Sequence, residues 1–426
     1  MQSFVIQGGR PLSGTVRAAG NKNGALPILA STVLATEPVV LTNVPRIRDV
    51  ETMVELLVDL GADASWTGPN EVTVDSAGVS KTALDPLLGR EIRASFLLAG
   101  PLLARFGRAT VPPPGGDVIG RRRLDTHIHA FAELGVEAEL NGAYDLRTSG
   151  LVGKRLFLDE ASVMATENAV MAAVLAKGET IVGHAACEPH IQDLCHFLVS
   201  LGARIEGIGS NILRIQGVET LAGGAYRIRP EHVEVASFAA LAATTGGDVT
   251  IEDVEPDDLI SIVPAFRKLG IALEVGETTV RVPPGQELHV VDDLGDQIPK
   301  IESGIWPAFP ADLTSIAVVA ATQARGTVLV FEKMFESRLF FVDKLVSMGA
   351  RIILCDPHRV VVTGPAKLFG QRLESPDIRA GMAMVIAALC AEGPSTIGNI
   401  GQIDRGYERI DERLRALGAS VERAEL

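Results

Sequence analysis

Residues 191–207, IQDLCHFLVSLGARIEG, carry the pattern that decides how this chain folds. Their first part spaces apolar side chains as one face of an α-helix does, and Gly202 follows directly. A glycine just beyond a helix can adopt the left-handed backbone that ends the helix, because it has no Cβ to clash. The residues after Gly202 alternate between apolar and charged, as a strand with one exposed face does. The stretch therefore predicts a helix that ends at Gly202 and continues into a strand.

The same pattern occurs six times along the chain, each time as a helix that ends in Leu-Gly or Met-Gly and leads into a strand. Successive glycines of the pattern are 74, 67, 68, 79 and 69 residues apart. They are Gly61, Gly135, Gly202, Gly270, Gly349 and Gly418. Solenoid repeats usually run about 20–50 residues, so periods this long favour closed domains over a stack of repeats. We expect six units arranged as two domains of three units each.

A second, alanine-rich helix is predicted upstream of the later glycines. Its copies are NAVMAAVLAKG at 168–178, SFAALAATTGG at 237–247, SIAVVAATQARG at 315–326 and AMVIAALCAEG at 383–393. These segments are apolar on nearly every side, which is typical of helices buried inside a domain. Strand-like stretches rich in β-branched residues follow them. We therefore expect an α/β protein in which helices form the inside of each domain and sheets form the outside.

The chain is acidic, with 39 basic and 53 acidic side chains and a formal net charge of −14 over 426 residues. Such a charge disfavours non-specific binding to nucleic acid or to anionic membranes, because the long-range field repels phosphates. The first residues lack the basic and apolar segments of a signal peptide, and no apolar run reaches the ~18 residues of a membrane span. We expect a soluble, cytoplasmic protein that binds neither nucleic acid nor membrane.

The cysteines indicate a reducing compartment. They are Cys187, Cys195, Cys355 and Cys390, and they show no C-x-x-C spacing. A disulfide framework is therefore disfavoured. The sequence predicts buried, free thiols.

Charge is concentrated on one loop, VPPPGGDVIGRRRLDTH at residues 111–127. Its prolines and glycines exclude a helix or a central strand. Asp117 precedes three consecutive arginines at 121–123. A lone acid beside a block of fixed positive charge on a bendable loop suggests a role in binding or chemistry.

Three other stretches place a charged side chain among loop residues. Lys22 and Asn23 follow Gly20 in AAGNKNGALP, which is not a P-loop, and such a lysine by itself is typical of a solvated turn. Arg93 precedes an apolar helix, where it is predicted either to help bind an anion or to be a plain surface arginine. Asp312 follows two prolines in WPAFPADLTS, where it is predicted either as a helix N-cap or as a general base.

Arginines recur at equivalent points of the last units. Arg338, Arg379 and Arg405 each stand where a loop or strand meets the next helix. Guanidinium forks suit planar and tetrahedral oxyanions because they make two-point contacts. The recurrence predicts one convergent cationic cluster.

Nine stretches together resemble the UDP-N-acetylglucosamine 1-carboxyvinyltransferase family of enolpyruvyl transferases, in order and over essentially the whole chain. No single motif is decisive, and the combination is specific. The stretches are GNKNGALPILA, IRASFLLAGPLLARFG, PGGDVIGRRRLDTH, SVMATEN, CEPHIQDLCHFLVSLGA, PAFPADL, FESRLFFVDKLVSMGA, DIRAG and IDRGYERIDERLRALGA.

The resemblance implies a two-domain inside-out α/β barrel of six units, three in each domain. Residues 22–230 would form one domain, which carries the mobile loop 111–123. Residues 1–21 and 231–426 would form the other, which carries the general base. The active site would lie in the cleft between the two domains.

The resemblance also implies the reaction. The enolpyruvyl group of phosphoenolpyruvate moves to the 3′-hydroxyl of UDP-N-acetylglucosamine and phosphate leaves, which is the first committed step of peptidoglycan synthesis. The implied steps are protonation of C3, attack of the deprotonated hydroxyl on C2, and elimination from a tetrahedral ketal. No metal or organic cofactor is implied.

Roles for individual residues follow from the resemblance. Asp312 would accept the proton of the acceptor hydroxyl, and Asp117 would take part in proton transfer. Asn23 would contact the sugar. Leu124 and Asp125 would meet the uracil ring, and Ser162 and Val163 the diphosphate. The cations that would hold phosphoenolpyruvate are Lys22, Arg122 and Arg405, with Arg93, Arg338 and Arg379 in the same cleft.

The charged loop is then expected to close over two substrates and to exclude water. Gly115 and Gly116 would let its tip move, so that Asp117 arrives on closure. Relatives usually have cysteine at position 117. A carboxyl group can transfer a proton but cannot be alkylated as a thiolate is. We therefore expect fosfomycin not to inactivate this protein.

Other departures from the family pattern concern acceptor recognition. Arg123 replaces a usual proline, Met164 a glycine, Ala311 a threonine and His232 an arginine. They leave open the same transfer to another nucleotide or to a secondary-metabolite alcohol. A non-catalytic binding paralogue is a further alternative. The related shikimate-pathway synthase is disfavoured, because its relatives read Gly-Asp-Lys-Ser where this chain reads Gly-Asn-Lys-Asn.

Overall fold

The computed structural model describes residues 2–116, 120 and 123–425. They separate into two compact units. The N-terminal unit comprises residues 20–116 and 123–229, and the C-terminal unit comprises residues 2–19, 120 and 230–425. The chain passes between the units at residues 19/20 and again at 229/230.

The described N-terminal unit contains three sheets, with strand orders β13-β3-β5-β4, β6-β8-β7 and β11-β12-β10-β9. β3 pairs parallel with β13, and β10 pairs parallel with β9, whereas the other pairs are antiparallel. The strands are β3 Val39–Thr42, β4 Asp63–Gly68, β5 Glu71–Asp75, β6 Arg108–Val111, β7 Glu137–Leu140, β8 Tyr144–Arg147, β9 Arg155–Phe157, β10 Glu179–Gly183, β11 Arg204–Glu206, β12 Ile212–Gln216 and β13 Gly224–Arg227.

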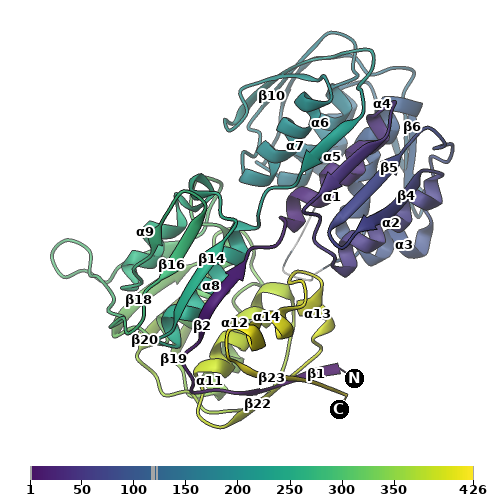
Figure 1. The fold of residues 1–426 in the computed structure, drawn as a ribbon. Helices are drawn as coiled ribbons and strands as arrows, with labels where there is room; N and C mark the ends of the chain where they lie inside the picture. The colour runs from purple at the N-terminus through teal and green to yellow at the C-terminus, as the bar shows by residue number, and fades with distance from the viewer. Residues whose placement is uncertain (1, 117–119, 121–122, 426) are drawn as a thin grey trace. The chain divides into compact units, whose positions relative to one another are not determined.

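The described C-terminal unit also contains three sheets, with orders β15-β16-β14-β2, β17-β18-β20-β19 and β21-β22-β1-β23. The first strand of the chain, β1, lies between β22 and the last strand, β23, so both ends of the chain belong to one sheet (Figure 1). The strands are β1 Gln2–Gln7, β2 Ser13–Arg17, β14 Asp248–Glu252, β15 Glu274–Val275, β16 Thr279–Val282, β17 Lys300–Glu302, β18 Gly326–Phe331, β19 Arg351–Asp356, β20 Arg359–Gly364, β21 Arg372–Glu374, β22 Pro394–Gly398 and β23 Ser420–Glu425.

Helices connect the strands within each unit. In the N-terminal unit they are α1 Lys22–Ser31, α2 Arg48–Leu60, α3 Pro86–Glu91, α4 Ala99–Phe106, α5 Asp125–Glu133, α6 Val163–Ala173 and α7 Pro189–Ser200, with the 3₁₀ turns η1 Thr32–Leu34 and η2 Arg93–Leu98. In the C-terminal unit they are α8 His232–Thr244, α9 Ile262–Lys268, α10 Thr314–Ala321, α11 Val342–Ser347, α12 Ile378–Cys390, α13 Gly401–Asp404 and α14 Ile410–Ala416, with η3 Pro256–Leu259 and η4 Ala311–Leu313.

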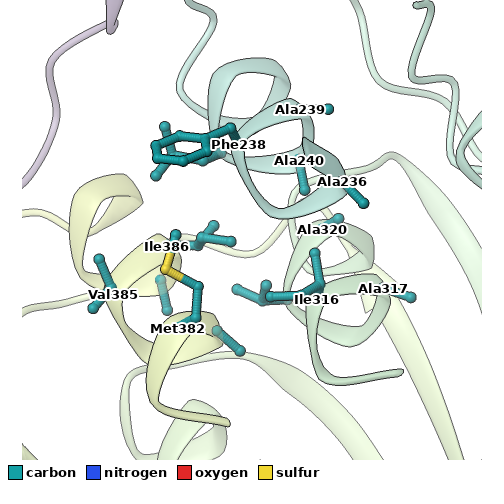
Figure 2. Close-up of a cluster of buried hydrophobic side chains, with 14 of the residues drawn as sticks. Ala236, Phe238, Ala239, Ala240, Ile316, Ala317, Ala320, Met382, Val385 and Ile386 are labelled. Carbon is teal, nitrogen blue, oxygen red and sulfur yellow. The ribbon is translucent and has the colours of Figure 1, made fainter. Parts of the chain in front are cut away.

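The alanine-rich helices are buried, as predicted. α8, α10 and α12 pack on one another, and Phe238, Ile316 and Met382 at their contact are 0% exposed (Figure 2). Small alanine side chains let the three helices approach closely, and strands of the three sheets of this unit pack against them. α6 is buried in the same way in the N-terminal unit, where its core is separate from that of the C-terminal unit.

The predicted helix ends are also confirmed. All six repeat glycines have a left-handed backbone, with φ between 76° and 108°. The strands β4, β7, β11, β15, β19 and β23 follow them. The repeat is therefore present in the structure as the sequence predicts it.

The prediction of buried thiols is wrong for one cysteine. All four cysteines are free, but Cys355 is exposed. It lies on β19, which is an edge strand of its sheet among the described strands. Separately, none of the helices in the described part of the chain has the length and hydrophobicity needed to cross a bilayer.

Candidate functional site

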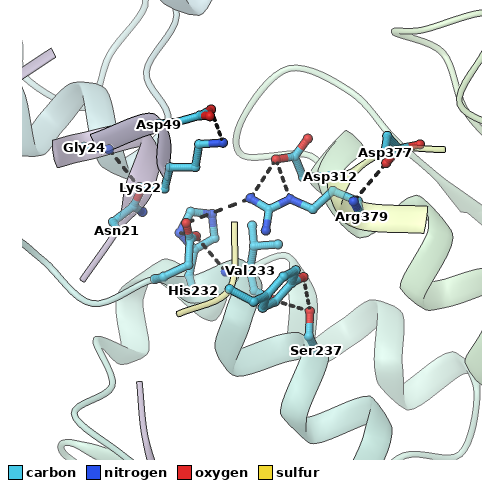
Figure 3. A network of polar contacts seen from close by, with 12 residues as sticks. Asn21, Lys22, Gly24, Asp49, His232, Val233, Ser237, Asp312, Asp377 and Arg379 are labelled. Carbon is cyan, nitrogen blue, oxygen red and sulfur yellow. Dashed lines mark hydrogen bonds and ion pairs between the residues drawn. The ribbon is translucent and has the colours of Figure 1, made fainter. Parts of the chain in front are cut away.

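A carboxylate held by two arginines lies in the C-terminal unit. Asp312 is the middle residue of η4, which leads into the buried helix α10. Nη2 of Arg338 lies 2.8 Å from its Oδ1. Nε and Nη2 of Arg379 lie 3.1 Å and 3.0 Å from its Oδ2 (Figure 3). Asp312 and Arg379 are 67 residues apart, so only folding brings them together.

Helix capping fixes Arg379 in this position. Asp377 caps α12, because its Oδ1 accepts the backbone N–H groups of Arg379 at 2.8 Å and Ala380 at 2.9 Å. On its other side, Nη2 of Arg379 lies 3.9 Å from Oε2 of Glu231, whose Oε1 caps α8. The guanidinium carbon also lies 5.5 Å from the ring centre of Tyr407. The side chain is thus set between two helix starts.

Arg379 remains charged, and both arginines keep donors available. Burial by itself lowers the pKa of Arg379, but Asp312, Tyr407 and Glu231 outweigh burial and raise the pKa above its usual value. Arg338 and Arg379 are 4% and 5% exposed. Nε of Arg338 and Nη1 of Arg379 make no hydrogen bond within the described part of the chain. Because unpaired buried donors are costly, these groups favour a further oxyanion beside Asp312.

The N-cap alternative for Asp312 is wrong. The residue before η4 is Pro310, and the cap position of α10 is Leu313, which has no side-chain cap. The carboxylate therefore points to the two arginines and does not cap the helix. Ala311 lies beside Asp312 and is half-buried.

Arg405, the third arginine of the predicted cluster, lies directly after α13 and is half-buried. Its Nη1 donates to Oε1 of Gln402 at 3.1 Å.

His232 begins α8 next to Glu231 and is 6% exposed. Its Nδ1 lies 3.8 Å from Oε1 of Glu231.

Lys22 forms a buried ion pair in the N-terminal unit. It is the first residue of α1, and its Nζ lies 2.7 Å from Oδ2 of Asp49 in the first turn of α2 (Figure 3). Lys22 and Asp49 are 7% and 5% exposed. Asn21 caps α1 by accepting the N–H of Gly24 at 3.0 Å, and Asn23 follows Lys22 in the same turn. The interpretation of Lys22 as a solvated loop residue is therefore wrong.

Arg93 lies near residues 123–125 of the charged loop, in the same unit. Arg93 begins η2, and its Nη2 donates to the backbone oxygen of Arg123 at 3.3 Å. Nε of Arg123 lies 2.7 Å from Oδ2 of Asp125, and this hydrogen bond lowers the pKa of Asp125. Both side chains are exposed, whereas Leu124 between them is buried. Arg123, which is an expected departure from the family pattern, thus directly contacts Asp125, a residue with an implied role in uracil binding.

Ser162 and Val163 lie at the start of α6. Ser162 is the N-cap residue, and its Oγ accepts the N–H of Ala165 at 3.4 Å. Val163 and Met164 follow, and all three are half-buried. The free N–H groups at such a helix start attract anions, which suits a phosphate group.

Asp117 and Arg122 lie outside the described residues. The described residues of the loop include Gly115 and Gly116, and a Cβ at Gly115 would overlap the backbone oxygen of Arg90. Glycine at position 115 is thus required by close backbone contact. Among the described residues, no cluster of histidine, cysteine and carboxylate side chains is arranged to hold a metal ion.

The sequence did not indicate Asp49 as the partner of Lys22, or Glu231 and Tyr407 as neighbours of Arg379. Asp49, Glu231 and Tyr407 have no motif that points to a partner.

His127 is a further residue that the sequence did not single out. It is buried, its Nδ1 accepts from Nδ2 of Asn168 at 3.1 Å, and burial, with a smaller contribution from Arg93, lowers its pKa to about 3.

Known proteins resemble the chain over its full length. The family model for EPSP synthase (3-phosphoshikimate 1-carboxyvinyltransferase) matches residues 6–414. A UDP-N-acetylglucosamine 1-carboxyvinyltransferase of Bradyrhizobium diazoefficiens is 55% identical over 99% of this chain and 97% of its own. One of Treponema denticola is 53% identical over 99% of both chains. This chain belongs to the UDP-N-acetylglucosamine 1-carboxyvinyltransferase family of enolpyruvyl transferases.

Solved structures agree with this family in their fold. The enolpyruvyl transferase NikO from Streptomyces tendae superposes with a TM-score of 0.89 at 24% identity, covering 99% of both chains. An EPSP synthase from Acinetobacter baumannii superposes with a TM-score of 0.77 at 19% identity over both full chains. At these identities the similarity shows that this family member has the α/β fold of the enolpyruvyl transferases.

Proposed function

We propose that the chain transfers the enolpyruvyl group of phosphoenolpyruvate to the 3′-hydroxyl of UDP-N-acetylglucosamine with release of phosphate. This is the first committed step of peptidoglycan synthesis. The chemistry requires a group that accepts a proton from the hydroxyl, and cations that neutralise a phosphate and a carboxylate. The chain supplies both kinds of group.

One observation carries the proposal: Asp312 is held by two buried arginines that keep spare donors. Arg338 and Arg379 can bind the carboxylate of an enol ester while Asp312 receives a proton beside it. Preorganised guanidinium groups of this kind stabilise charge that develops in a transition state. A protein that only bound the nucleotide would need no such carboxylate.

The other residues complete the proposed chemistry. Lys22, Arg122 and Arg405 bind phosphoenolpyruvate with Arg93, while Asn23 contacts the sugar. Asp117 takes part in proton transfer to C3 of the enol. The oxygen of the acceptor hydroxyl then forms a bond to C2 as Asp312 takes its proton. Loss of phosphate from C2 of the resulting ketal, together with loss of a proton from C3, restores the double bond.

The diphosphate and the base of the nucleotide need separate contacts. We assign the diphosphate to the start of α6, where Ser162 and Val163 lie, and the uracil ring to Leu124 and Asp125. The half-buried N-terminus of α6 supports this assignment, because its N–H groups attract phosphate oxygens.

We also propose the finer architecture of the family for this chain. Residues 22–230 and residues 1–21 with 231–426 form two inside-out α/β barrels of three units, and the substrates bind in the cleft between them. Three sheets in each unit, outside buried helices, support this proposal for the described residues. Clefts between domains commonly hold ligands.

A second candidate function keeps the chemistry and changes the acceptor. The exposed ion pair of Arg123 with Asp125 favours it, because it engages a residue assigned to uracil binding. Met164 stands at the start of α6, where the family resemblance implies glycine and a diphosphate is expected.

The decisive experiment is a phosphate-release assay with phosphoenolpyruvate and a panel of acceptors. Release with UDP-N-acetylglucosamine, and not with UMP, supports the main proposal. Release only with another alcohol supports the second candidate. Absence of release with every acceptor, together with nucleotide binding, means that the chain is a binding paralogue.

A further inference from the structure

The first turn of α1 depends on contacts from outside the helix. Pro27 lies inside α1 and has no N–H, so the backbone oxygen of Asn23 lacks its usual helical donor. Within the turn, the N–H groups of Gly24 and Ala25 are bound by the side chain and backbone of Asn21 at 3.0 Å and 2.8 Å. The position of Lys22 therefore depends on what holds Asn21.

Asn21 is held by a segment far away in the sequence. Its backbone N–H donates to the oxygen of Arg229 at 2.8 Å, and Asn21 is 1% exposed. The backbone N–H of Arg229 in turn donates to Oδ2 of Asp193 at 3.1 Å. Asp193 thus reaches the α1 turn through two consecutive hydrogen bonds, one to the backbone N–H of Arg229 and one from the backbone N–H of Asn21 to the oxygen of Arg229.

Asp193 lies on α7 and is itself fixed. It is 0% exposed, and its Oδ1 accepts the hydroxyl of Tyr226 at 2.7 Å. Burial raises the pKa of Asp193, and the hydrogen bonds from Tyr226 and Arg229 oppose that rise. Its carboxylate also packs against α1, because a Cβ built on Gly24 would lie 3.2 Å from Oδ2.

We propose that Asp193 is a positioning residue for the reaction. Its buried carboxylate fixes Arg229 and Asn21, and through them the turn that carries Lys22 and Asn23. This inference rests on the proposed function only where it concerns turnover. The structural part, that Asp193 orders the first turn of α1, stands by itself.

The test compares Asp193→Ala, Asn21→Ala and the double variant with the unchanged full chain. We expect each single change to raise the KM for phosphoenolpyruvate about tenfold or more, because one misplaced turn weakens binding of the anion. Since both act on the same turn, the double variant should lose little more than either alone. Asp193→Asn keeps an oxygen for the N–H of Arg229 and should restore most of the activity.

Hydrogen exchange of amides 21–26 gives a readout independent of activity. Asp193→Ala should speed exchange there about tenfold and leave α4 unchanged. Arg105→Met is the control, because it removes two side-chain hydrogen bonds to backbone oxygens in the same unit, those of Val33 and Ser76. It should lower the melting temperature without changing either readout.

The possible results distinguish failure of this inference from failure of the proposed function. Unchanged exchange in the α1 turn of Asp193→Ala overturns the positioning role. A KM that changes only as much as in Arg105→Met also overturns it. If the unchanged protein releases no phosphate with any acceptor, the proposed function fails, and the exchange data still decide the role of Asp193.

Discussion

Nε and Nη2 of Arg379 both lie within 3.1 Å of Oδ2 of Asp312, and Arg338 binds the other oxygen of the same carboxylate. The proposed base is therefore part of the cationic cluster that is proposed to bind the substrate. A substitution of Asp312 or Arg379 would therefore change both the charge of the cluster and the reaction step in which that residue is proposed to act. The first two predictions separate these functions.

Asp312→Asn should lower kcat by about 10²–10⁴-fold, because the amide cannot accept the hydroxyl proton. The Kd for UDP-N-acetylglucosamine should stay within about threefold, since this change leaves the residues assigned to the nucleotide intact. Phosphate release and calorimetry measure the two quantities. Asp343→Asn, at an exposed carboxylate paired with Lys344 in the same unit, is the control. Unchanged turnover in Asp312→Asn contradicts its role as the base.

Arg379→Lys should raise the KM for phosphoenolpyruvate by about tenfold to hundredfold. Lysine keeps the positive charge but loses the planar fork that makes two contacts at once. Steady-state kinetics at saturating nucleotide measure the effect. Arg359→Lys provides the control, because Arg359 is exposed and pairs with Asp356 on the surface. Equal KM values for Arg379→Lys and the unchanged protein exclude Arg379 from phosphoenolpyruvate binding.

Fosfomycin should leave the enzyme active, because a carboxylate at position 117 does not react as a thiolate does. Asp117→Cys should retain turnover and become sensitive to the epoxide. Mass spectrometry of the intact protein after incubation measures covalent addition. An adduct on Asp117 in the unchanged protein contradicts the prediction, and Asp117→Ala shows whether other residues react.

Acid should destabilise the protein through His127. The pKa of this buried imidazole is lowered to about 3, whereas the unfolded value is near 6.5. The unfolded chain therefore binds more protons between these values, so stability is complete above pH 6.5 and falls as the pH drops toward 3. At pH 5 the loss is about 2 kcal/mol, which is ~1.36 kcal/mol for each pH unit.

His127→Gln should remove this loss, because glutamine does not titrate. Urea unfolding at pH 5 and pH 7 measures the difference for both proteins. His129→Gln is the control, since His129 lies on the same helix and is exposed. A pH dependence that is the same in His127→Gln and in the unchanged protein contradicts the assignment.

Met382→Ala should destabilise the C-terminal unit by about 2–5 kcal/mol, because it leaves a cavity where α8, α10 and α12 meet. Met382 is 0% exposed and packs in the centre of this contact (Figure 2). Met334→Ala removes the same atoms from a side chain that is 39% exposed and should cost much less. Chemical unfolding followed by circular dichroism compares the two.

Much of the fold could be predicted from local patterns. Gly202 ends its helix as its Leu-Gly position indicates, and residues 315–322 of the alanine-rich segment are buried because they offer no polar face. These features follow from side-chain spacing within about ten residues. The exposure of Cys355 could not be predicted, because it depends on β19 being an edge strand.

The candidate site shows the same division. Lys22, Asp312 and Arg379 could be selected from the sequence as candidate site residues, because each is a charged residue next to the predicted start of a helix. Their contacts could not be predicted, because the sequence is equally compatible with an N-cap at Asp312 and a solvated loop at Lys22, and the ion pairs exclude both. No feature of the sequence around Asp49 or Asp193 indicates what either carboxylate binds.

The sequence by itself determined the repeated unit, the ends of its helices and the burial of the alanine-rich helices. These depend on periodicity and on the backbone freedom of single residues, which are local properties. Only the tertiary structure decided that Lys22 meets Asp49, that Arg379 meets Asp312 and that Asp193 supports the α1 turn. Such pairs join segments that are far apart in the sequence. The packing of whole helices and sheets brings these segments together, so a local sequence pattern does not encode the contact.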